Sequence, residues 1–331
     1  MPRRYRGLLP VLLGLSVSCS SNSFDSLQLD SAIGAIATRV KPGRIGVAVM
    51  DISSGETWSI AGTDWFPMQS VFKLPLGAAV LDAVGRGAFA LTDTITLTPA
   101  DLSPPYSPIS AAYPGRRTWT VRELLVAAVG GSDNTAADVV MKMIGGPEAV
   151  TSWLESKGVS DVRIDRYERE FQLELNGMPP FQPAWAQESV FLARLNELPA
   201  ETRKAATMRY LDDPRDTATP LGAVNFLATL QRGELLAPPL TAELLRIATE
   251  TTTGAKRLKA GLPAGAMIAH KTGTARPDHG INPAINDIGI VTLADGRTIA
   301  VVTFLTASTL SVAEAEAVLA DVMRGLLSAI R

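Results

Sequence analysis

A serine and a lysine three residues apart, Ser70 and Lys73, are the first residues in the chain whose types and spacing could do covalent chemistry. If a helix begins at Ser70, Lys73 lies one turn further along the same face. A serine hydroxyl is a poor nucleophile until a base takes its proton, and a neutral or desolvated lysine can act as that base. The helix N-terminus would add a positive potential and a backbone N–H aimed at an oxyanion. The spacing alone is weak evidence, because such a pair is more often two residues of a solvated face.

A second cluster, Ser132-Asp133-Asn134, lies between two stretches that are expected to be helices. The Ser132 hydroxyl could pass a proton to a leaving nitrogen, and the Asn134 side chain could hydrogen-bond a substrate amide. The simpler interpretation is that these residues cap the helix that follows. The two interpretations are compatible.

A third cluster, Lys271-Thr272-Gly273-Thr274, falls on an expected strand. Gly273 would let a substrate backbone approach closely. Thr274 could offer its backbone N–H as a second oxyanion donor. Lys271 would place positive charge near the proton path and near a substrate carboxylate. The alternative is an ordinary edge strand with a lysine on its solvent face.

The fourth cluster, Arg166-Tyr167-Glu168, lies in a polar stretch of poor periodicity. A carboxylate close to Ser70 could activate a water molecule to hydrolyse an acyl-enzyme. Taken alone, an acidic residue in such a stretch is most often a surface residue.

The composition of the chain narrows the chemistry that these clusters could do. The 331 residues are 46% hydrophobic and 19% charged, which is enough apolar material for a full core. The formal net charge is -2 and there is no basic block, so nothing favours nucleic acid as a partner. One cysteine and two histidines allow no intramolecular disulfide and nearly exclude a His/Cys zinc site. Acid–base chemistry must therefore rely on Lys, Glu, Asp or Tyr, although a Ser-His-Asp triad has His270 and His279 as candidate bases.

The first twenty residues are typical of a secretory signal peptide. Three arginines precede a short apolar run, Leu8 to Val17, which small residues follow. The run is too short to cross a bilayer. Cys19 stands where a bacterial lipoprotein carries its lipidated cysteine, and cleavage near Ser18 or Ser20 is the alternative. We therefore expect an exported, periplasmic protein, and leave open whether Cys19 anchors it to lipid.

Strand patterns lie near both ends of the chain and helical patterns lie between them. Residues 24–40 have helical spacing, and strands are expected at 44–51, 57–60, 267–274, 287–293 and 298–305. Helices are expected from Ser70, behind the capping box Thr120/Glu123, after Asn134, from Pro147 and after Ser311. The two ends of the chain should therefore meet in one antiparallel sheet, with a helical lobe between them. The cleft between the two lobes is the default site.

Taken together, the motifs S-x-x-K, S-D-N and K-T-G are the signature of class A β-lactamases and penicillin-binding proteins. All three occur here in that order, and the sequence resembles a class A serine β-lactamase from about residue 24 to its C-terminus. The stretch around Ser70 is similar to the branch that includes the PER and VEB enzymes. Further local similarities are Tyr106-Ser107-Pro108, Arg215-Asp216-Thr217-Ala218-Thr219-Pro220, Thr252-Thr253-Gly254-Ala255-Lys256-Arg257 and Asn286-Asp287-Ile288-Gly289.

This resemblance implies a two-step reaction. Ser70 would attack a lactam carbonyl and form an acyl-enzyme. Lys73, Glu168 through water, or both would accept the Ser70 proton, a choice that is disputed for the family. Ser132, helped by Lys271, would return a proton to the lactam nitrogen, and Glu168 would then activate water for deacylation.

The resemblance also implies which residues bind the substrate. The oxyanion hole would be the backbone N–H groups of Ser70 and Thr274. The remaining substrate contacts would come from Tyr106, Asn134, Thr272, Gly273, Thr274 and Arg257, with Lys271 beside the substrate carboxylate. Arg257 would matter for its planar, bidentate fork. The partner would be a small-molecule β-lactam antibiotic, with no metal and no cofactor, and the protein is expected to be a monomer.

The implied fold is α+β, of the β-lactamase/transpeptidase type, with a five-stranded antiparallel sheet flanked by helices and an all-helical lobe. Residues 21–331 would form one catalytic domain after the signal peptide at 1–20. Its α/β lobe would comprise 24–65 and 221–331, and its helical lobe 66–220.

The chain departs from the family between Glu168 and Arg215, where it is much longer than the common Ω loop. We expect a small helical insertion at about 169–214, with helices near 189–198 and from 199 onward. Glu170 and Glu174 therefore compete with Glu168 as the deacylating carboxylate. Gln172 is the expected amide that positions the water, with Asn176 as its rival. The insertion could cover or widen the cleft.

Three other functions fit part of the pattern. A D,D-peptidase or penicillin-binding protein shares the three motifs but deacylates slowly. A lactam sensor would trap the acyl-enzyme, and a serine esterase of related fold would have less use for Asn134 and Lys271. Glu168 and the Arg215-Asp216 stretch favour the lactamase. The sequence leaves the preference between penicillins and cephalosporins open. Certain carbapenem-hydrolysing members have a disulfide beside the nucleophile, and this chain lacks it, because Gln69 precedes Ser70 and no partner cysteine exists.

Overall fold

The computed structural model describes residues 23–331. The expected signal peptide at 1–20, including Cys19, lies outside the described residues. No helix within residues 23–331 is long and apolar enough to cross a membrane. The two ends of the described chain lie together, since the backbone N–H of Arg331 donates to the carbonyl of Ser23.

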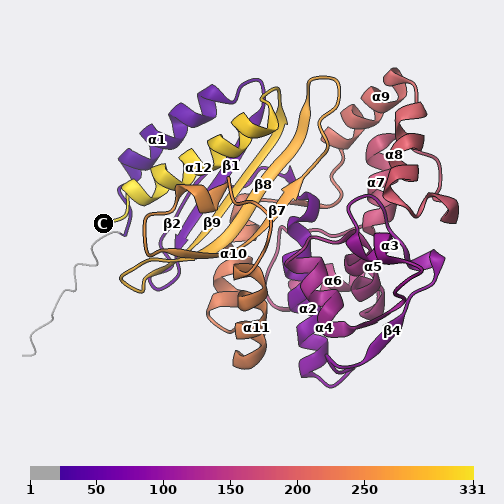
Figure 1. The fold of residues 1–331 in the computed structure, drawn as a ribbon. Helices are drawn as coiled ribbons and strands as arrows, with labels where there is room; N and C mark the ends of the chain where they lie inside the picture. Colours follow the sequence, from indigo (N-terminus) through magenta and orange to yellow (C-terminus); the bar gives the residue numbers. More distant parts are fainter. Residues whose placement is uncertain (1–22) are drawn as a thin grey trace, which may run out of the picture.

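A five-stranded antiparallel sheet joins segments from both ends of the chain, in the order β2-β1-β9-β8-β7 (Figure 1). Its strands are β1 (Arg44–Asp51), β2 (Thr57–Ile60), β7 (Met267–Thr274), β8 (Asn282–Thr292) and β9 (Thr298–Ser308). The three central strands are buried on both faces, which explains their nearly continuous apolar sequences. The predicted sheet is confirmed, and β7 lies at its edge.

Helices cover both faces of this sheet (Figure 1). On one face α1 (Ser26–Arg39) packs against α12 (Val312–Ser328), and their apolar side chains form a core with Val47 and Val49 of β1. On the other face α10 (Pro220–Gln231) packs against β1, β8 and β9. The predicted cap of α12 is present as a capping box between Ser311 and Glu314.

The helical lobe is built around α2 (Lys73–Gly85), which is buried along most of its length because it is apolar on nearly every side. Against it pack α4 (Val121–Val129), α5 (Asn134–Met143) and α6 (Pro147–Ser156), and α3 (Pro108–Ala112) packs on α5. Helix α11 (Pro238–Thr249) packs against both α2 and β7, and so joins the two lobes. The capping box of Thr120 and Glu123 before α4 is confirmed. Two short ribbons complete this part, β3 (Phe66–Pro67) with β6 (Thr217–Ala218) and β4 (Thr94–Thr96) with β5 (Thr118–Thr120).

Three further helices lie between Glu168 and Arg215, and we call them the α7–α9 segment. They are α7 (Glu168–Asn176), α8 (Glu188–Glu197) and α9 (Ala200–Leu211). The helices expected near 189–198 and from 199 onward are confirmed. The segment has a small apolar core of its own, in which Phe191 and Leu195 of α8 pack with Trp185. Figure 1 shows it at the upper right, above the helical lobe and beside the upper end of the sheet.

Three differences from the sequence-based expectations bear on the site. A 3-10 turn, Gln69–Phe72, carries Ser70, and the α-helix begins only at Lys73. Strand β8 begins at Asn282, five residues earlier than expected, because the polar Asn282 and Asn286 are buried within it. Helix α7 was not expected, since its polar sequence EREFQLELN shows its apolar face only through Phe171, Leu173 and Leu175.

Candidate active site

The nucleophile candidate Ser70 lies in a strained turn that is anchored to the sheet. Gln69, directly before it, has φ of 50°, a left-handed conformation that is costly for a non-glycine residue and is typical of functional sites. Buried Asn286 of β8 donates its Nδ2 to the carbonyls of Pro67 (2.8 Å) and Met68 (3.0 Å), which fixes this turn. Gln69 itself donates to the hydroxyl of buried Tyr210, at 2.6 Å, and so connects the turn to α9.

Gly273 has a packing role beside the one expected. A Cβ atom built on Gly273 would lie 2.3 Å from the carbonyl oxygen of Met68. The absent side chain is therefore needed first for the close packing of β7 against the turn that carries Ser70. The approach of a substrate backbone remains a prediction.

Lys73 is fully buried and points into a group of acceptors. Its Nζ lies 2.9 Å from the Ser132 carbonyl, 2.5 Å from Asn134 Oδ1 and 2.9 Å from Glu168 Oε1. The arrangement links three of the four sequence clusters through a single ammonium group.

Glu168 is the carboxylate that the structure brings to the nucleophile. Ser70 Oγ donates to Glu168 Oε1 at 3.2 Å, and Gln172 Nε2 donates to Glu168 Oε2 at 3.1 Å. Glu174 instead accepts from Arg166 and Arg215, so it serves as a structural ion-pair partner. Of the competing positions, Glu168 and Gln172 are the ones that this geometry favours.

A buried aspartate that the sequence analysis did not identify holds Glu168 in place. Asp138 of α5 accepts from the backbone N–H groups of Glu168 (2.7 Å) and Arg169 (3.1 Å) and from Ser103 Oγ (2.6 Å). It thereby caps α7, whose own first residues supply no capping side chain. Burial, opposed by these hydrogen bonds, raises the pKa of Asp138 to about 6.

Lys271 and Ser132 form the second polar pair of the site. Lys271 Nζ donates to Ser132 Oγ at 2.9 Å and to the Thr272 carbonyl at 2.9 Å. Complete burial, with Lys73 as a nearby like charge, lowers the pKa of Lys271 well below its usual value. Ser132 has φ of 60°, a second strained residue at the site.

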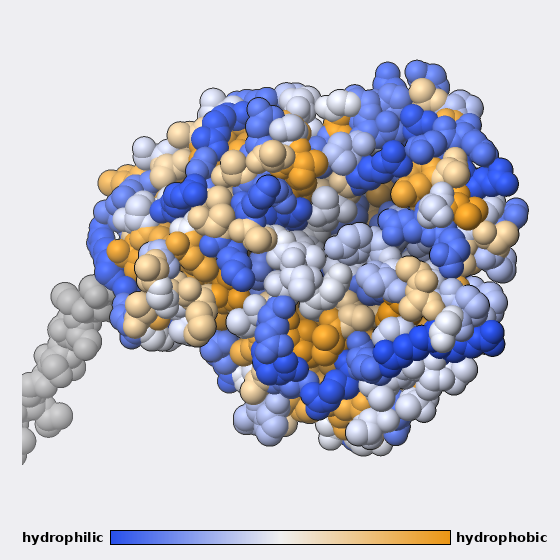
Figure 2. All heavy atoms as spheres, in the orientation of Figure 1, coloured by the Kyte–Doolittle hydropathy of each residue, from blue (hydrophilic) through white to orange (hydrophobic). Residues whose placement is uncertain are grey.

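The residues expected to bind substrate lie around a cleft of about 520 Å³. Tyr106 is half exposed on one wall, and its carbonyl accepts from the backbone N–H of Asn134. Asn134 is tied by its side chain to Lys73 and to the Pro105 carbonyl. Thr272 is buried and bonded to Thr253, whereas Thr274 is exposed at the end of β7. Figure 2 shows residues of near-neutral hydropathy gathered in the hollow at the centre of this face.

Arg257 differs in part from the expectation of direct carboxylate binding. It lines the cleft but is only 5% exposed. Its guanidinium donates to the carbonyls of Gly273 and Asn286 and to Thr274 Oγ1, and it pairs with Glu316. Most of its donors are therefore already used, because they hold the end of β7 and orient the Thr274 hydroxyl.

The two histidines are the candidate bases of a Ser-His-Asp triad. His270 is fully buried and its Nδ1 lies 2.9 Å from Asp287 Oδ1, while His279 is exposed in the loop after β7. Neither residue contacts Ser70. Among residues 23–331 we find no group of three or more His, Cys, Asp or Glu side chains arranged to hold a metal ion.

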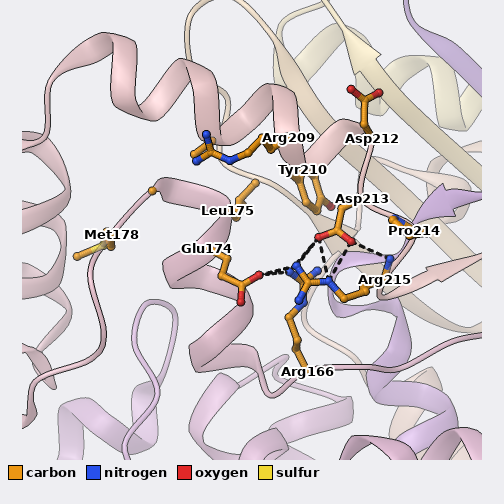
Figure 3. A pocket seen from close by; sticks show the side chains of 12 residues that line it. Arg166, Glu174, Leu175, Met178, Arg209, Tyr210, Asp212, Asp213, Pro214 and Arg215 are labelled. Carbon is orange, nitrogen blue, oxygen red and sulfur yellow. Dashed lines mark hydrogen bonds and ion pairs between the residues drawn. The ribbon is translucent and has the colours of Figure 1, made fainter.

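A larger cavity, of about 830 Å³, lies behind α7 and contains neither Ser70 nor Lys271 among its lining residues. Figure 3 shows Arg166, Glu174, Asp213 and Arg215 joined there in one ion-pair network. Arg166 also pairs with buried Asp216 at 2.6 Å, which closes the neck of the α7–α9 segment. The larger cavity is lined by the ion pairs that hold the α7–α9 segment in place. The smaller cleft is the candidate active site, since it is lined by Ser70 and Ser132.

Several contacts could not be found from the sequence motifs. Asp138 follows Asn134 by four residues, so the two side chains lie on the same face of one helix. This spacing could have indicated that Asp138 is near the site. The contact of Tyr210 with Gln69, and those of Glu188 and Leu192 with the cleft, have no local signal in the sequence. They depend on how the α7–α9 segment folds back.

Comparisons with known proteins agree with this geometry. The family profile described as the β-lactamase enzyme family matches residues 28–330. Beta-lactamase VEB-1 of Pseudomonas aeruginosa is 31% identical over 82% of this chain and 80% of its own length. Extended-spectrum beta-lactamase PER-1 of the same organism is 32% identical over 94% of this chain and 90% of its own.

Solved structures show the same fold. A β-lactamase from Chitinophaga pinensis superposes with a TM-score of 0.75 at 32% identity, covering 91% of this chain and 98% of that one. A class A β-lactamase reconstructed as the last common ancestor of Gram-negative bacteria gives a TM-score of 0.74 at 34% identity, covering 91% and 98%. With Glu168 and Lys73 in contact beside Ser70, and Lys271 bonded to Ser132, this chain belongs to the class A serine β-lactamases of the β-lactamase enzyme family.

Proposed function

We propose that this enzyme hydrolyses the β-lactam ring of penicillins and cephalosporins through an acyl-enzyme on Ser70. One observation supports assignment as a hydrolase and not as a penicillin-binding protein that deacylates slowly. The Glu168 carboxylate lies within 3.2 Å of Ser70 Oγ and within 2.9 Å of Lys73 Nζ, where it can act on an ester formed at Ser70. The named relatives are β-lactamases, which supports the same assignment.

In the acylation step, the Ser70 hydroxyl attacks the lactam carbonyl carbon, and its proton passes to the coupled pair Glu168 and Lys73. The direct contact of Ser70 Oγ with Glu168 and the contact of Glu168 with Lys73 allow either group to hold that proton. The backbone N–H groups of Ser70 and Thr274 stabilise the oxyanion. The C–N bond of the lactam then breaks.

The lactam nitrogen takes its proton from Ser132. The Ser132 hydroxyl is replenished by Lys271, whose Nζ donates to it at 2.9 Å. The lowered pKa of Lys271 makes this ammonium a better proton donor than an exposed lysine. The substrate carboxylate, held by Thr272 and Thr274 with Lys271 and Arg257 behind them, orients the ring.

Before deacylation, the proton that the Glu168–Lys73 pair took from Ser70 is returned to Lys271, so that Glu168 is again a carboxylate. In the deacylation step, Glu168 takes a proton from a water molecule as that water attacks the ester carbon. Gln172, bonded to Glu168 Oε2, orients the carboxylate and the water. The C–O bond to Ser70 breaks, Ser70 recovers its proton, and the opened lactam leaves as a carboxylate. Asn134 and Tyr106 hold the acylamide side chain through both steps.

We also propose that the protein is exported, acts in the periplasm and works as a monomer. The arginines, the apolar run and the small residues before residue 21 support export. Cys19 supports a lipid anchor as one form of this localisation.

The test is intact-protein mass against time after mixing with a cephalosporin, for the wild type and for Glu168→Gln. We expect a transient adduct on Ser70 in the wild type, with many turnovers, and a persistent adduct in the variant. A persistent adduct in the wild type would instead identify a penicillin-binding or sensor protein. Normal turnover by Glu168→Gln would exclude Glu168 as the deacylating base.

A further inference from the structure

Helix α8 forms part of the wall of the active-site cleft. Glu188 and Leu192 line the same cleft as Ser70 and Asn134. They are four residues apart and so share one face of the helix, while Phe191 and Leu195 on the neighbouring face fill the core of the segment. The α7–α9 segment therefore presents two side chains of different chemistry to a bound substrate.

Contacts at both ends of α8 fix it across the cleft. Just before its first turn, the Ala186 carbonyl accepts from buried Ser110 Oγ at 2.6 Å, and Gln187 Nε2 donates to the Tyr113 carbonyl. Near its last turn, Asn196 Oδ1 accepts from Arg276, just beyond β7, at 3.3 Å. A helix of ten residues is about 15 Å long, which suits a strut between these two anchors.

These anchors place Glu188 toward the side of the cleft that Tyr106 and Asn134 occupy. Ser110 and Tyr113 belong to the stretch of chain directly after Tyr106. Arg276, the exposed cation of the cleft, lies at the opposite end of α8. A lactam side chain held by Asn134 would thus extend toward Glu188 and away from Arg276.

The Glu188 carboxylate is not neutralised by any ion pair within residues 23–331. The other charged groups near the cleft either have ion-pair partners or, like Arg276, lie at the other end of α8. Glu168 is paired with Lys73, and Arg257 is paired with Glu316. Glu188 is exposed and therefore carries its negative charge where a substrate side chain enters. Leu192, one turn on and half buried, adds an apolar surface next to that charge.

We propose that Glu188 and Leu192 form a specificity subsite for the lactam's acylamide side chain, which favours a side chain that carries an ammonium group on an apolar body. The subsite rests on the proposed hydrolysis of β-lactams. The ammonium group pairs with Glu188, and the apolar body lies on Leu192. Because the contact is with a part of the substrate that does not react, it should lower KM more than it raises kcat.

The experiment compares two penicillins that differ by one amino group, with phenylacetyl and phenylglycyl side chains. kcat and KM are measured for the wild type, Glu188→Gln and Glu188→Lys. Glu197→Gln, at the exposed end of α8, is the matched control. The ratio of kcat/KM for the ammonium substrate over the neutral one should fall about two- to fivefold in Glu188→Gln, as one exposed charge pair allows. In Glu188→Lys it should fall further.

The fall should appear mainly in KM, weaken as salt is added, and be absent in Glu197→Gln. Leu192→Ala should reduce kcat/KM for both penicillins alike, since both carry the phenyl ring. An unchanged substrate ratio in both Glu188 variants, with normal turnover of both penicillins, would overturn the subsite and leave the proposed function intact. Failure of the wild type to turn over either penicillin would instead count against the proposed function itself.

Discussion

The two sides of the active site are held by different kinds of structure. Lys271 lies on β7, which is joined to β8 by an antiparallel ladder running from Met267 to Thr274. Glu168 lies at the first turn of α7, which depends on the Asp138 cap and on the Arg166–Asp216 pair at the neck of its segment. Lys271, the proton donor of acylation, thus rests on the main sheet, whereas Glu168 rests on a few buried polar contacts.

This difference implies that the two half-reactions can be damaged separately. A backbone ladder keeps its geometry when one side chain changes, because its hydrogen bonds are made by the main chain. A polar network around one helix end loses its geometry when a single partner is removed, since the remaining buried groups lack bonds. Variants on the two sides should therefore separate acylation from deacylation.

The largest effect is expected from Lys271→Met. Removing the donor to Ser132 should slow acylation by about 10²- to 10⁴-fold, because proton delivery to the leaving nitrogen is lost. Methionine replaces a buried ammonium with an apolar chain, so the free energy of unfolding should not fall. Single-turnover mass measurements should show slow appearance of the adduct and no accumulation. Rapid accumulation of the acyl-enzyme would show that Lys271 does not serve acylation.

Arg166→Ala should disrupt the other side. It leaves Asp216 buried without its cation, a change that typically costs about 3–5 kcal/mol in the free energy of unfolding. At temperatures where the fold persists, the adduct on Ser70 should form and then hydrolyse slowly. Urea unfolding and adduct decay measure the two effects. Arg163→Ala, from an exposed pair with Asp165 in the same loop, is the control. Equal behaviour of the two variants would contradict the role of the neck.

Asp138 gives a pH test of the α7 cap. Its pKa of about 6 is raised above the usual value, so the folded protein binds this proton more tightly than the unfolded chain does. The stability from this group is therefore greatest below about pH 4 and is lost as the pH rises through about 6. Asp138→Asn removes this dependence while keeping an acceptor for the backbone N–H groups.

The melting temperature of Asp138→Asn relative to the wild type should consequently rise between pH 4.5 and pH 7.5. Other buried carboxyls whose pKa is raised, such as Asp133 and Asp216, are common to both proteins and cancel in the comparison. A difference in melting temperature that is constant with pH would exclude Asp138 as the titrating group.

The smallest effect is expected from Arg215→Ala. Arg215 pairs with Glu174 and Asp213, but its own side chain is 42% exposed, and exposed pairs contribute about 1 kcal/mol or less each. Acylation and deacylation rates should both stay within about twofold of the wild type. A loss comparable to that of Arg166→Ala would mean that the whole network, and not its buried member, holds the neck.

Much of this site could be predicted because its residues lie in short motifs with local geometry. Ser70 with Lys73, and the run from Lys271 to Thr274, fix their own relative positions through a turn and a strand. The capping boxes and the strands near both ends were equally local. What the sequence hid were contacts between distant segments: Asp138 with α7, and Tyr210 with Gln69. Their partners are set by how helices pack, so the spacing of Asp138 from Asn134 could place it on the same helix face but could not identify Glu168 as its partner.

Arg257 illustrates the same limit within a recognised motif. Its position beside β7 followed from the family resemblance, but its hydrogen-bond partners did not. Gly273 and Asn286 present carbonyls to it, and Glu316 reaches it from α12. A motif fixes where a side chain starts, and the packed neighbours determine which of its donors remain for a substrate.

The sheet order has a consequence for how the chain reaches its native state. Strand β1 is made early, yet its long partner β9 and the helix that packs with α1 come from the other end of the chain. At synthesis rates of about 5–20 residues per second, β1 can pair with β2 at once, but its other edge waits for β9 while most of the protein is made. A nascent or truncated chain therefore exposes an apolar strand edge and cannot close the sheet that carries Lys271. Antibiotic resistance supplied by such an enzyme should thus depend on the unfinished chain not aggregating before β9 and α12 have been made.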